Sequence, residues 1–173
     1  VLDNYASFSH NGYPKVAPAF ASSLAILIGH WNEVFPKLAF LLMFLPPLIL
    51  AYSIFKKTQY IILLTIIFFT IGKFLFNGWM DGLVAVYFGF SAFLFYILTI
   101  EEQSTYKKNN LLYCIAFCFF VILTLIKNEG IALLLILFLA SLLLIFFTNK
   151  FKNNLYVLFL LSSSFLPIIV WKS

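Results

Sequence analysis

The sequence predicts an all-α fold, a polytopic transmembrane helical bundle of about six spans with a juxtamembrane helix before them. Hydrophobic residues make up 64% of the 173 residues and charged residues only 10%, whereas a soluble domain is about half apolar and about a quarter charged. The apolar residues run in continuous blocks and lack the one-sided stripe of a surface helix. Several blocks reach the roughly 20 residues that a helix needs to cross a bilayer core.

Residues 1–36 are expected to form an outer loop that carries the juxtamembrane helix. This helix is predicted over residues 14–30, because Pro suits the first turn of a helix and Gly29 is a stop signal. One face of this helix carries three small residues, Ala17, Ala21 and Ala25. Small residues allow membrane helices to pack closely. With about 15 residues the helix is short for a span, so an interfacial or re-entrant placement is at least as well favoured.

Residues 37–173 are expected to contain the spans. The six apolar blocks cover residues 37–55, 60–76, 82–100, 111–126, 131–147 and 155–170. Pro46 and Pro47 predict a kink in the first block, because proline removes a backbone donor and clashes with the preceding turn. We interpret residues 1–173 as a single transmembrane domain cut at both ends, since the chain starts with Val and stops just after an apolar block.

Lysine counts predict which side of the membrane each loop faces. Alternate loops form two sets, and one set holds three clusters, Lys56-Lys57, Lys107-Lys108, and Lys150 with Lys152. We expect this set in the cytoplasm, which places the loop before residue 82 and the break after residue 126 on the outer face. The net charge of +5 comes from lysines scattered through short loops, so a nucleic-acid partner is not expected.

The eleven basic residues are all lysine, and Phe, Ile, Leu and Asn are also abundant. This composition is typical of an AT-rich bacterial genome, so the expected location is the bacterial inner membrane. Cys114 and Cys118 are expected to act as small apolar packing residues, because two thiols without a nearby His cannot make a zinc site.

Two polar breaks between apolar blocks hold candidate functional residues. Asp81 is either an acidic cap of the third block or a carboxylate that lines an outer cavity as a base, metal ligand or hydroxyl binder. Lys127 and Glu129 are either an interfacial ion pair, or a phosphate-binding lysine and a carboxylate that orients it or binds sugar hydroxyls. Charges beside hydrocarbon are costly and tend to be functional.

A third polar cluster precedes the first helix and contains His10, Tyr13 and Lys15. It is either an ordinary loop or a phosphate-binding entry to the helix, because a helix N-terminus favours an anion. Asp3 is a further candidate acid or metal ligand. The chain contains no phosphate-cradling glycine loop, nucleophile elbow or metal-spaced His/Cys set. We expect the three clusters to face one site on the outer side.

The pattern His-x-Gly-Tyr-Pro-x-Val-x-Pro at residues 10–18, followed by Gly-His-Trp-Asn-Glu at residues 29–33, resembles the first outer loop of a known family. That family is the C-type superfamily of polytopic glycosyltransferases, which includes protein mannosyltransferases and bacterial aminoarabinose transferases. Trp-x-Asp-Gly at residues 79–82 and the break at residues 127–130 are similar to a bacterial branch of it. The motifs are short and degenerate, and together they extend over most of the chain.

The resemblance implies transfer of a sugar from a polyprenyl-phosphate carrier to an acceptor glycan, lipid or protein at the outer face of the bilayer. A carboxylate acts as base on the acceptor hydroxyl, and basic residues hold the carrier phosphate. The implied catalytic residues are Asp3, Asp81 and Glu129, and the implied phosphate-binding residues are His10, Tyr13, Lys15 and Lys127. The family's usual catalytic carboxylate is expected upstream of Val1. No cofactor is firmly implied, and a divalent metal is left open.

Two other functions compete with the enzyme. A transporter or flippase would line a pathway with Asp81, Lys127 and Glu129, and a non-catalytic membrane scaffold would use the same residues as caps and anchors. Transporters usually place polar residues and broken helices at mid-membrane, often in two related halves. The charges here sit at the ends of apolar blocks and no halves repeat, which favours the enzyme.

Overall fold

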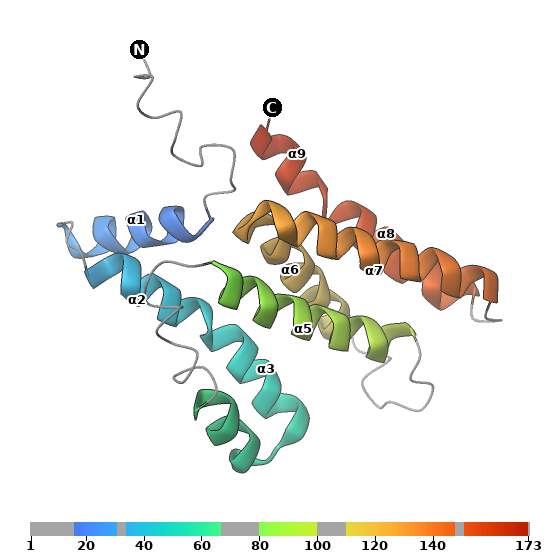
Figure 1. Cartoon of the computed structure of the whole chain (residues 1–173), viewed down its shortest axis with the longest axis horizontal. Helices are drawn as coiled ribbons and strands as arrows, with labels where there is room; N and C mark the ends of the chain where they lie inside the picture. The colour runs from blue at the N-terminus through green and yellow to red at the C-terminus, as the bar shows by residue number, and fades with distance from the viewer. Residues whose placement is uncertain (1–15, 31–33, 67–79, 100–109, 148–150, 173) are drawn as a thin grey trace.

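The computed structural model describes residues 16–30, 34–66, 80–99, 110–147 and 151–172. These residues are almost entirely helical, and no strand occurs among them (Figure 1). The helices are α1 (Val16–Ile28), α2 (Val34–Met43), α3 (Leu45–Phe55), α5 (Asp81–Thr99), α6 (Asn110–Ile126), α7 (Asn128–Phe147), α8 (Phe151–Ser163) and α9 (Leu166–Lys172). Residues 58–66 form a further helical segment. The all-α prediction is confirmed.

Two of these helices, α5 with 19 residues and α7 with 20, are long and apolar enough to cross a membrane. At a rise of about 1.5 Å per residue, each is about 30 Å long, which matches a bilayer core. The predicted block at 111–126 is α6, with 17 residues. The first and last blocks are each divided between two shorter helices, and the second is described only to residue 66. Six full-length spans are therefore not seen within the described ranges.

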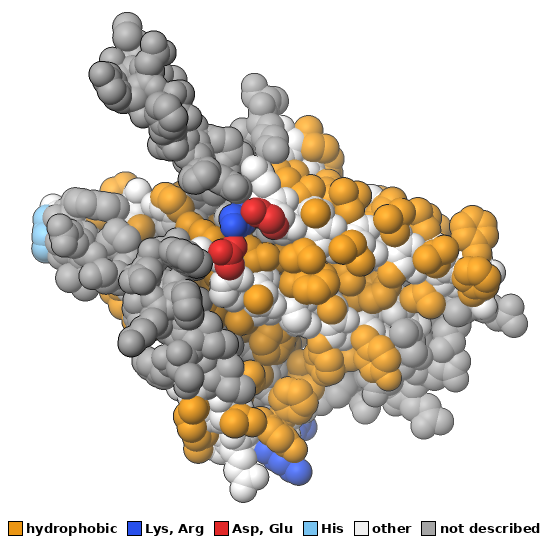
Figure 2. Space-filling model, in the orientation of Figure 1, with side chains coloured by type: hydrophobic (Ala, Val, Ile, Leu, Met, Phe, Trp, Pro, Cys, Tyr) orange, Lys and Arg blue, Asp and Glu red, His pale blue; other side chains and the backbone are white. Residues whose placement is uncertain are grey.

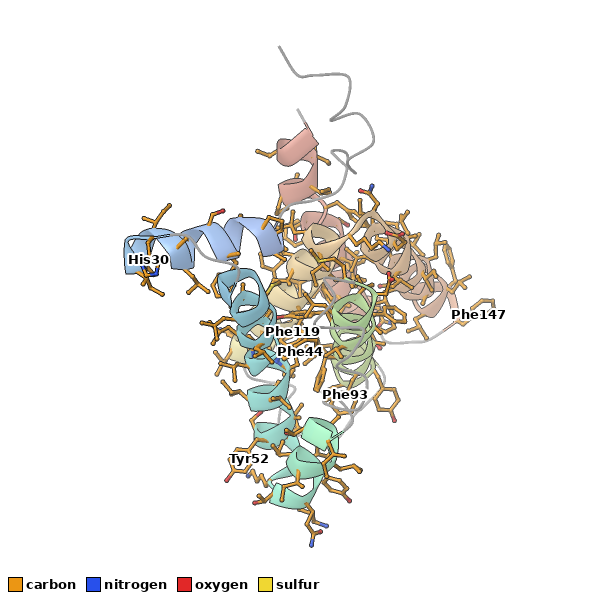
Figure 3. The ribbon with its side chains drawn as sticks, turned by 60° about the vertical axis from the view of Figure 1, so that its left-hand side comes forward. His30, Phe44, Tyr52, Phe93, Phe119 and Phe147 are labelled. Carbon is orange, nitrogen blue, oxygen red and sulfur yellow. The ribbon has the colours of Figure 1, made fainter. Side chains whose placement is uncertain are left out.

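The helix α1 packs against α2, and its alanine face is buried, which agrees with the close packing that small residues predict. Ala17, Ala21 and Ala25 are all buried. Gly29 ends the helix with a φ of +86°, and its N–H donates to the Ala25 carbonyl at 2.9 Å, which is the left-handed C-terminal cap expected of glycine. Figure 3 shows α1 crosswise to the α2–α3 pair, with His30 at its far end. Its 13 residues span about 20 Å, too short to cross a bilayer core.

The predicted proline kink separates α2 from α3 at Phe44. In an unbroken helix, the Met43 carbonyl would accept a hydrogen bond from the N–H of residue 47, but Pro47 has none. The hydroxyl of Tyr87 on α5 donates to the Met43 carbonyl instead, at 2.8 Å. Tyr87 is only 1% exposed, so one buried side chain satisfies a carbonyl that the kink leaves open and ties α5 to the α2–α3 pair.

A second break divides the predicted block 155–170 into α8 and α9, so this block is not one continuous helix. Pro167 cannot donate to the Ser163 carbonyl, which lies one helical turn before it. Three successive serine hydroxyls donate to backbone carbonyls just upstream, Ser162 to Leu158 and both Ser163 and Ser164 to Leu160. Serine back-bonding of this kind bends helices, and it accompanies the break here.

The core lies where α5 packs against α6 and α7, with α8 beside them. Its largest side chains with less than 2% exposure include Tyr87, Phe120, Leu83, Leu94, Leu98, Leu123 and Leu134. The rings of Tyr87 and Phe119 lie 5.2 Å apart between centroids, a spacing typical of favourable aromatic pairs. Cys114 and Cys118 are not part of this core. Both thiols are exposed on α6, so the prediction that they are packing residues was wrong.

Candidate functional site

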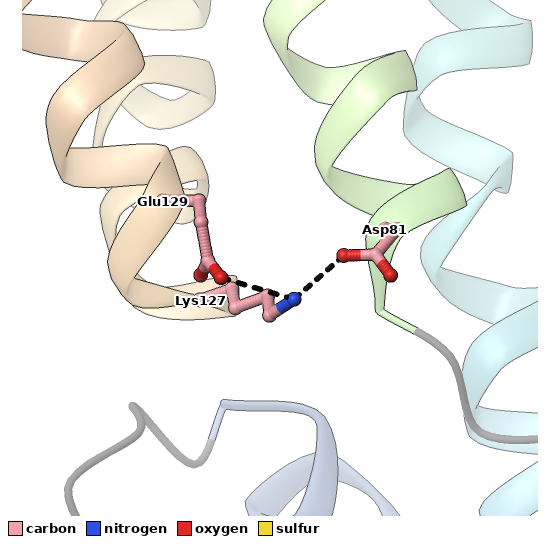
Figure 4. A network of polar contacts seen from close by, with 3 residues as sticks. All are labelled: Asp81, Lys127 and Glu129. Carbon is pink, nitrogen blue, oxygen red and sulfur yellow. Dashed lines mark hydrogen bonds and ion pairs between the residues drawn. The ribbon is translucent and has the colours of Figure 1, made fainter.

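The charged ends of α5 and α7 meet at Lys127 (Figure 4). The Nζ atom of Lys127 lies 2.6 Å from Oδ1 of Asp81 and 3.1 Å from Oε1 of Glu129. Asp81 and Glu129 are the two acidic residues within the described part of the chain, and both converge on this one lysine. We call Asp81, Lys127 and Glu129 the charge triad.

Lys127 lies in a tight turn, in which the start of α7 packs directly against the last turn of α6. Only Lys127 separates the two helices, and the N–H of Gly130 donates to the Lys127 carbonyl at 2.9 Å. A Cβ atom at position 130 would lie 1.9 Å from the carbonyl oxygen of Leu123, far inside van der Waals contact. Glycine is therefore required at this position, where the start of α7 lies against the backbone of α6.

Both carboxylates of the triad sit at helix N-termini. Asp81 is the first residue of α5 and Glu129 is the second residue of α7. A helix macrodipole places partial positive charge at its N-terminus, so a carboxylate there is stabilised by about 0.3–1 kcal/mol. The cap interpretation and the ion-pair interpretation of these residues therefore describe one arrangement, in which Lys127 links two capped helix ends.

The lysine of the triad is more enclosed than its partners. The side chain of Lys127 is 22% exposed, whereas those of Asp81 and Glu129 are 62% and 53% exposed. The hydrogen bond to Asp81, followed by that to Glu129, raises the pKa of Lys127 above its usual value, so this ammonium is charged at neutral pH. One lysine faces two acids, which gives the triad a formal charge of −1. Each exposed ion pair contributes only about 0–1 kcal/mol to stability.

The beginning of α1 lies near the triad. Figure 4 shows the first turn of α1 beside the turn that holds Lys127, and α1 contacts α6. The predicted third cluster directly precedes α1 in the sequence. The residues of the predicted site that lie outside the described residues are Asp3, His10, Tyr13 and Lys15. The structure thus brings three of the seven candidates into contact, and the roles of all seven stay predictions.

The lysine pair at the end of α3 lies away from the triad. Lys56 closes α3 in a left-handed conformation, with its N–H donating to the Tyr52 carbonyl at 2.9 Å. Figure 2 shows the Lys56-Lys57 charges and the triad as separate patches, with hydrophobic side chains between them. The two groups are thus separate on this surface, and their placement on opposite sides of a membrane stays a prediction.

Sequence reasoning missed a hollow between α6 and α8. Its volume is about 520 Å³, and it is lined by Asn110, Tyr113, Cys114, Tyr156, Phe159 and Leu160. A second hollow of about 440 Å³ runs along α8 and shares Tyr156 and Phe159 with the first. The only sequence signal was a tyrosine close to the start of each helix, a position that membrane proteins favour at the interface.

The chemistry open to the triad is that of carboxylates and one ammonium. The acids can bind hydroxyl groups or accept a proton, and Lys127 can bind an anion as a point charge. Among the described residues, no group of three or more His, Cys, Asp or Glu side chains is placed to hold a metal ion. A divalent metal would therefore need ligands beyond the triad.

No protein-family model, curated protein or solved structure matches this chain. The function proposed below therefore depends on the residues and their geometry, and the motif resemblance stays a prediction.

Proposed function

We propose that this chain is a multi-pass integral membrane protein of the bacterial inner membrane. The outer surface of α7 supports this, because large apolar side chains between 45% and 82% exposed cover it, namely Leu135, Ile136, Leu139, Leu143, Phe146 and Phe147. Figure 2 shows hydrophobic side chains over most of the visible described surface. A contiguous surface of this kind is an aggregation liability in water and is the normal exterior of a protein in hydrocarbon.

In this proposal α5, α6 and α7 cross the membrane, and the pairs α2–α3 and α8–α9 cross it as broken helices. The predicted block at 60–76 crosses between α3 and α5, which places the end of α3 and the start of α5 on opposite sides. A broken span is tolerated in hydrocarbon only where neighbouring groups satisfy the freed backbone atoms. At the first break, the hydroxyl of Tyr87 supplies such a group to the Met43 carbonyl, which Pro47 leaves without a backbone donor. The short α1 then lies at the outer interface, beside the triad.

We expect cysteine labelling to report opposite sides for the triad and the α3 end. In a chain with Cys114 and Cys118 changed to serine, a membrane-impermeant maleimide should label Glu129→Cys in intact spheroplasts. Lys57→Cys should react only after the cells are permeabilised. The reverse pattern would invert the orientation, and labelling of both in intact spheroplasts would refute a membrane-crossing chain.

The function proposed for the triad is transfer of a sugar from a polyprenyl-phosphate donor to an acceptor hydroxyl at the outer face. The observation that carries it is Lys127 held between Asp81 and Glu129 at one end of an otherwise apolar bundle. A donor anchored in the bilayer presents its phosphate at the membrane interface. There Lys127 exchanges one carboxylate for the phosphate, and that carboxylate becomes available to the acceptor.

The proposed step balances without an oxidant or reductant. The acceptor hydroxyl oxygen attacks the anomeric carbon of the sugar, and its proton passes to Asp81 or Glu129. The bond between the anomeric carbon and the phosphate oxygen breaks, and its electron pair leaves on the polyprenyl phosphate. The ammonium of Lys127 stabilises the negative charge that grows on that oxygen. Both bond changes occur at the interface, where the donor is held.

Substitution in the full protein tests the proposal. With undecaprenyl phosphate carrying a radiolabelled hexose as donor, we expect loss of the general base, through Asp81→Asn or Glu129→Gln, to lower kcat about 100-fold or more. Lys127→Ala should mainly raise KM for the donor. The matched control is Lys57→Ala, which removes a lysine from the other end of the bundle and should leave transfer unchanged.

A purely structural triad makes a different prediction. In that case the three triad variants would insert in the membrane and transfer sugar at the unsubstituted rate, with only a small loss of thermal stability. This result would reject the proposed catalytic site and favour the scaffold function.

A further inference from the structure

We propose that a crevice on α5 holds one acyl chain of an anionic phospholipid, with the lipid phosphate at Lys56 and Lys57. The crevice lies between α5 and the hairpin that α3 forms with the helical segment 58–66 (Figure 1). It is separate from the triad, because Lys127 contacts the start of α5 whereas the crevice reaches Phe93 in its second half. The inference depends on the membrane location proposed above and does not depend on sugar transfer.

The length and the lining of the crevice suit an acyl chain of the cytoplasmic leaflet. Along α5 the lining extends from Ala85 to Phe93, which is about 12 Å at a rise of about 1.5 Å per residue. Half of a bilayer core is about 15 Å thick. Every lining residue is apolar, and the volume is about 290 Å³, close to the lower end of the range for small-molecule sites. The crevice therefore suits one acyl chain and leaves the second chain in the surrounding bilayer.

A row of aromatic rings connects the crevice to a lysine. The rings of Phe55 and Phe93 both line the crevice, and their centroids lie 6.2 Å apart. The ring of Tyr60 lies 5.3 Å from that of Phe55 between centroids. The Nζ atom of Lys57 lies 5.9 Å from the centroid of the Tyr60 ring, which is within the range of cation–π contacts. The ammonium therefore lies close to the crevice wall, at the end where the phosphate of a bound lipid is expected.

Charge complementarity selects an anionic lipid over a neutral one. Lys56 and Lys57 are adjacent, and both are exposed. The acidic residues that the structure describes, Asp81 and Glu129, belong to the triad, which Figure 2 shows as a patch separate from these lysines. A zwitterionic lipid carries an ammonium group that offsets its phosphate, whereas phosphatidylglycerol has a net negative charge. Lysines at the cytoplasmic surface of a membrane attract such anionic lipids.

A thiol in the crevice provides a direct test. Gly89 lines the crevice, and a Cβ atom there meets nothing within 4 Å, so Gly89→Cys introduces the thiol without a clash. With both native cysteines changed to serine, added phosphatidylglycerol should slow maleimide labelling of this thiol in detergent about ten-fold when the lipid is about ten-fold above its Kd. The control is the exposed Cys118 of α6 in the Cys114→Ser protein, whose labelling should not change. Phosphatidylcholine at the same concentration should protect neither thiol.

Two further variants test the headgroup and the chain separately. Lys56→Gln with Lys57→Gln should raise the lipid concentration that protects Gly89→Cys about 30-fold, whereas Lys127→Gln, at the other end of α5, should not. Gly89→Phe places a ring in the crevice, so native mass spectrometry should show phosphatidylglycerol retained by the unsubstituted protein and lost from this variant.

Equal protection of Gly89→Cys by both lipids would overturn the proposal. So would equal retention of phosphatidylglycerol by Gly89→Phe and the unsubstituted protein. Circular dichroism checks that Gly89→Phe keeps its helical content, and the lysine variants test the site without any change in the crevice. Carbonate extraction and the labelling of Glu129→Cys report the membrane location separately.

Discussion

Replacement of Gly130 by alanine should lower the unfolding midpoint of this protein by about 6–12 °C. The added Cβ atom would lie 1.9 Å from the carbonyl oxygen of Leu123 and 2.9 Å from its carbonyl carbon. Neither atom can rotate away, because both belong to the backbone of α6. The two helices must separate, and we expect a cost at the upper end of the usual range for overpacking, about 3 kcal/mol. For a chain of this size, each 1 kcal/mol shifts the midpoint by about 2–4 °C.

The matched control for this substitution is Gly89→Ala, in the middle of α5. A Cβ atom at position 89 meets nothing within 4 Å, and alanine is favoured over glycine within a helix by about 0.5–1 kcal/mol. We expect its midpoint to equal or slightly exceed that of the unsubstituted protein. Both midpoints can be measured by circular dichroism during thermal unfolding in detergent. Equal midpoints for the two variants would contradict the close approach of α6 and α7.

The substitution Gly130→Ala should also disturb the charge triad. Lys127 is the one residue between α6 and α7, so we expect separation of these helices to move it and to lengthen its 2.6 Å contact to Asp81. A coupling energy between Lys127 and Asp81, measured by a double-mutant cycle, should therefore fall toward zero in the Gly130→Ala background. This result would show that the interaction between Lys127 and Asp81 depends on the close packing at Gly130.

The positions of the helices were largely predictable from the sequence. Continuous apolar blocks end where charged or turn residues begin, so the predicted 82–100 and 111–126 correspond to α5 and α6 within one residue at each end. The left-handed cap at Gly29 and the break at Pro46-Pro47 follow from local backbone chemistry alone. The division of block 155–170 was also signalled, by three serines before Pro167, but the residues on either side of them are apolar, and the block was predicted as one span.

The contacts between helices were much less predictable. A helix that is apolar on every face carries little information about which face meets which neighbour, and α7 is such a helix. Alternation of loops was enough to place Asp81 and Lys127 at the same end of the bundle. Their 2.6 Å contact further requires α5 and the end of α6 to be neighbours, which is a property of tertiary packing. The hollow between α6 and α8 escaped prediction for the same reason.

Tyr87 is the clearest example of a residue whose importance only the structure reveals, and we expect Tyr87→Ala to cost about 3–5 kcal/mol. Its ring is 1% exposed and lies 5.2 Å from the ring of Phe119, so truncation leaves a cavity in the core. The lost hydroxyl also leaves the Met43 carbonyl without its donor from α5. The expected fall in the unfolding midpoint is about 6–20 °C.

Tyr87→Phe separates the hydroxyl from the ring. It keeps the ring and removes only the 2.8 Å bond to the Met43 carbonyl, so we expect a cost of about 1–2 kcal/mol, the range for a lost bond to a buried group. Tyr96→Phe is the matched control, because Tyr96 lies on the same helix and is 48% exposed. Its midpoint should not change.

A double-mutant cycle with Pro47→Ala tests why the hydroxyl is needed. Alanine at position 47 restores the backbone N–H that an unbroken helix would donate to the Met43 carbonyl. If that missing donor is the reason for the bond from Tyr87, then Tyr87→Phe should cost about 1 kcal/mol less in the Pro47→Ala background than in the native one. The cavity left by the smaller residue appears in both arms of the cycle and cancels. Equal costs in the two backgrounds would mean that Tyr87 stabilises the packing of α5 independently of the kink.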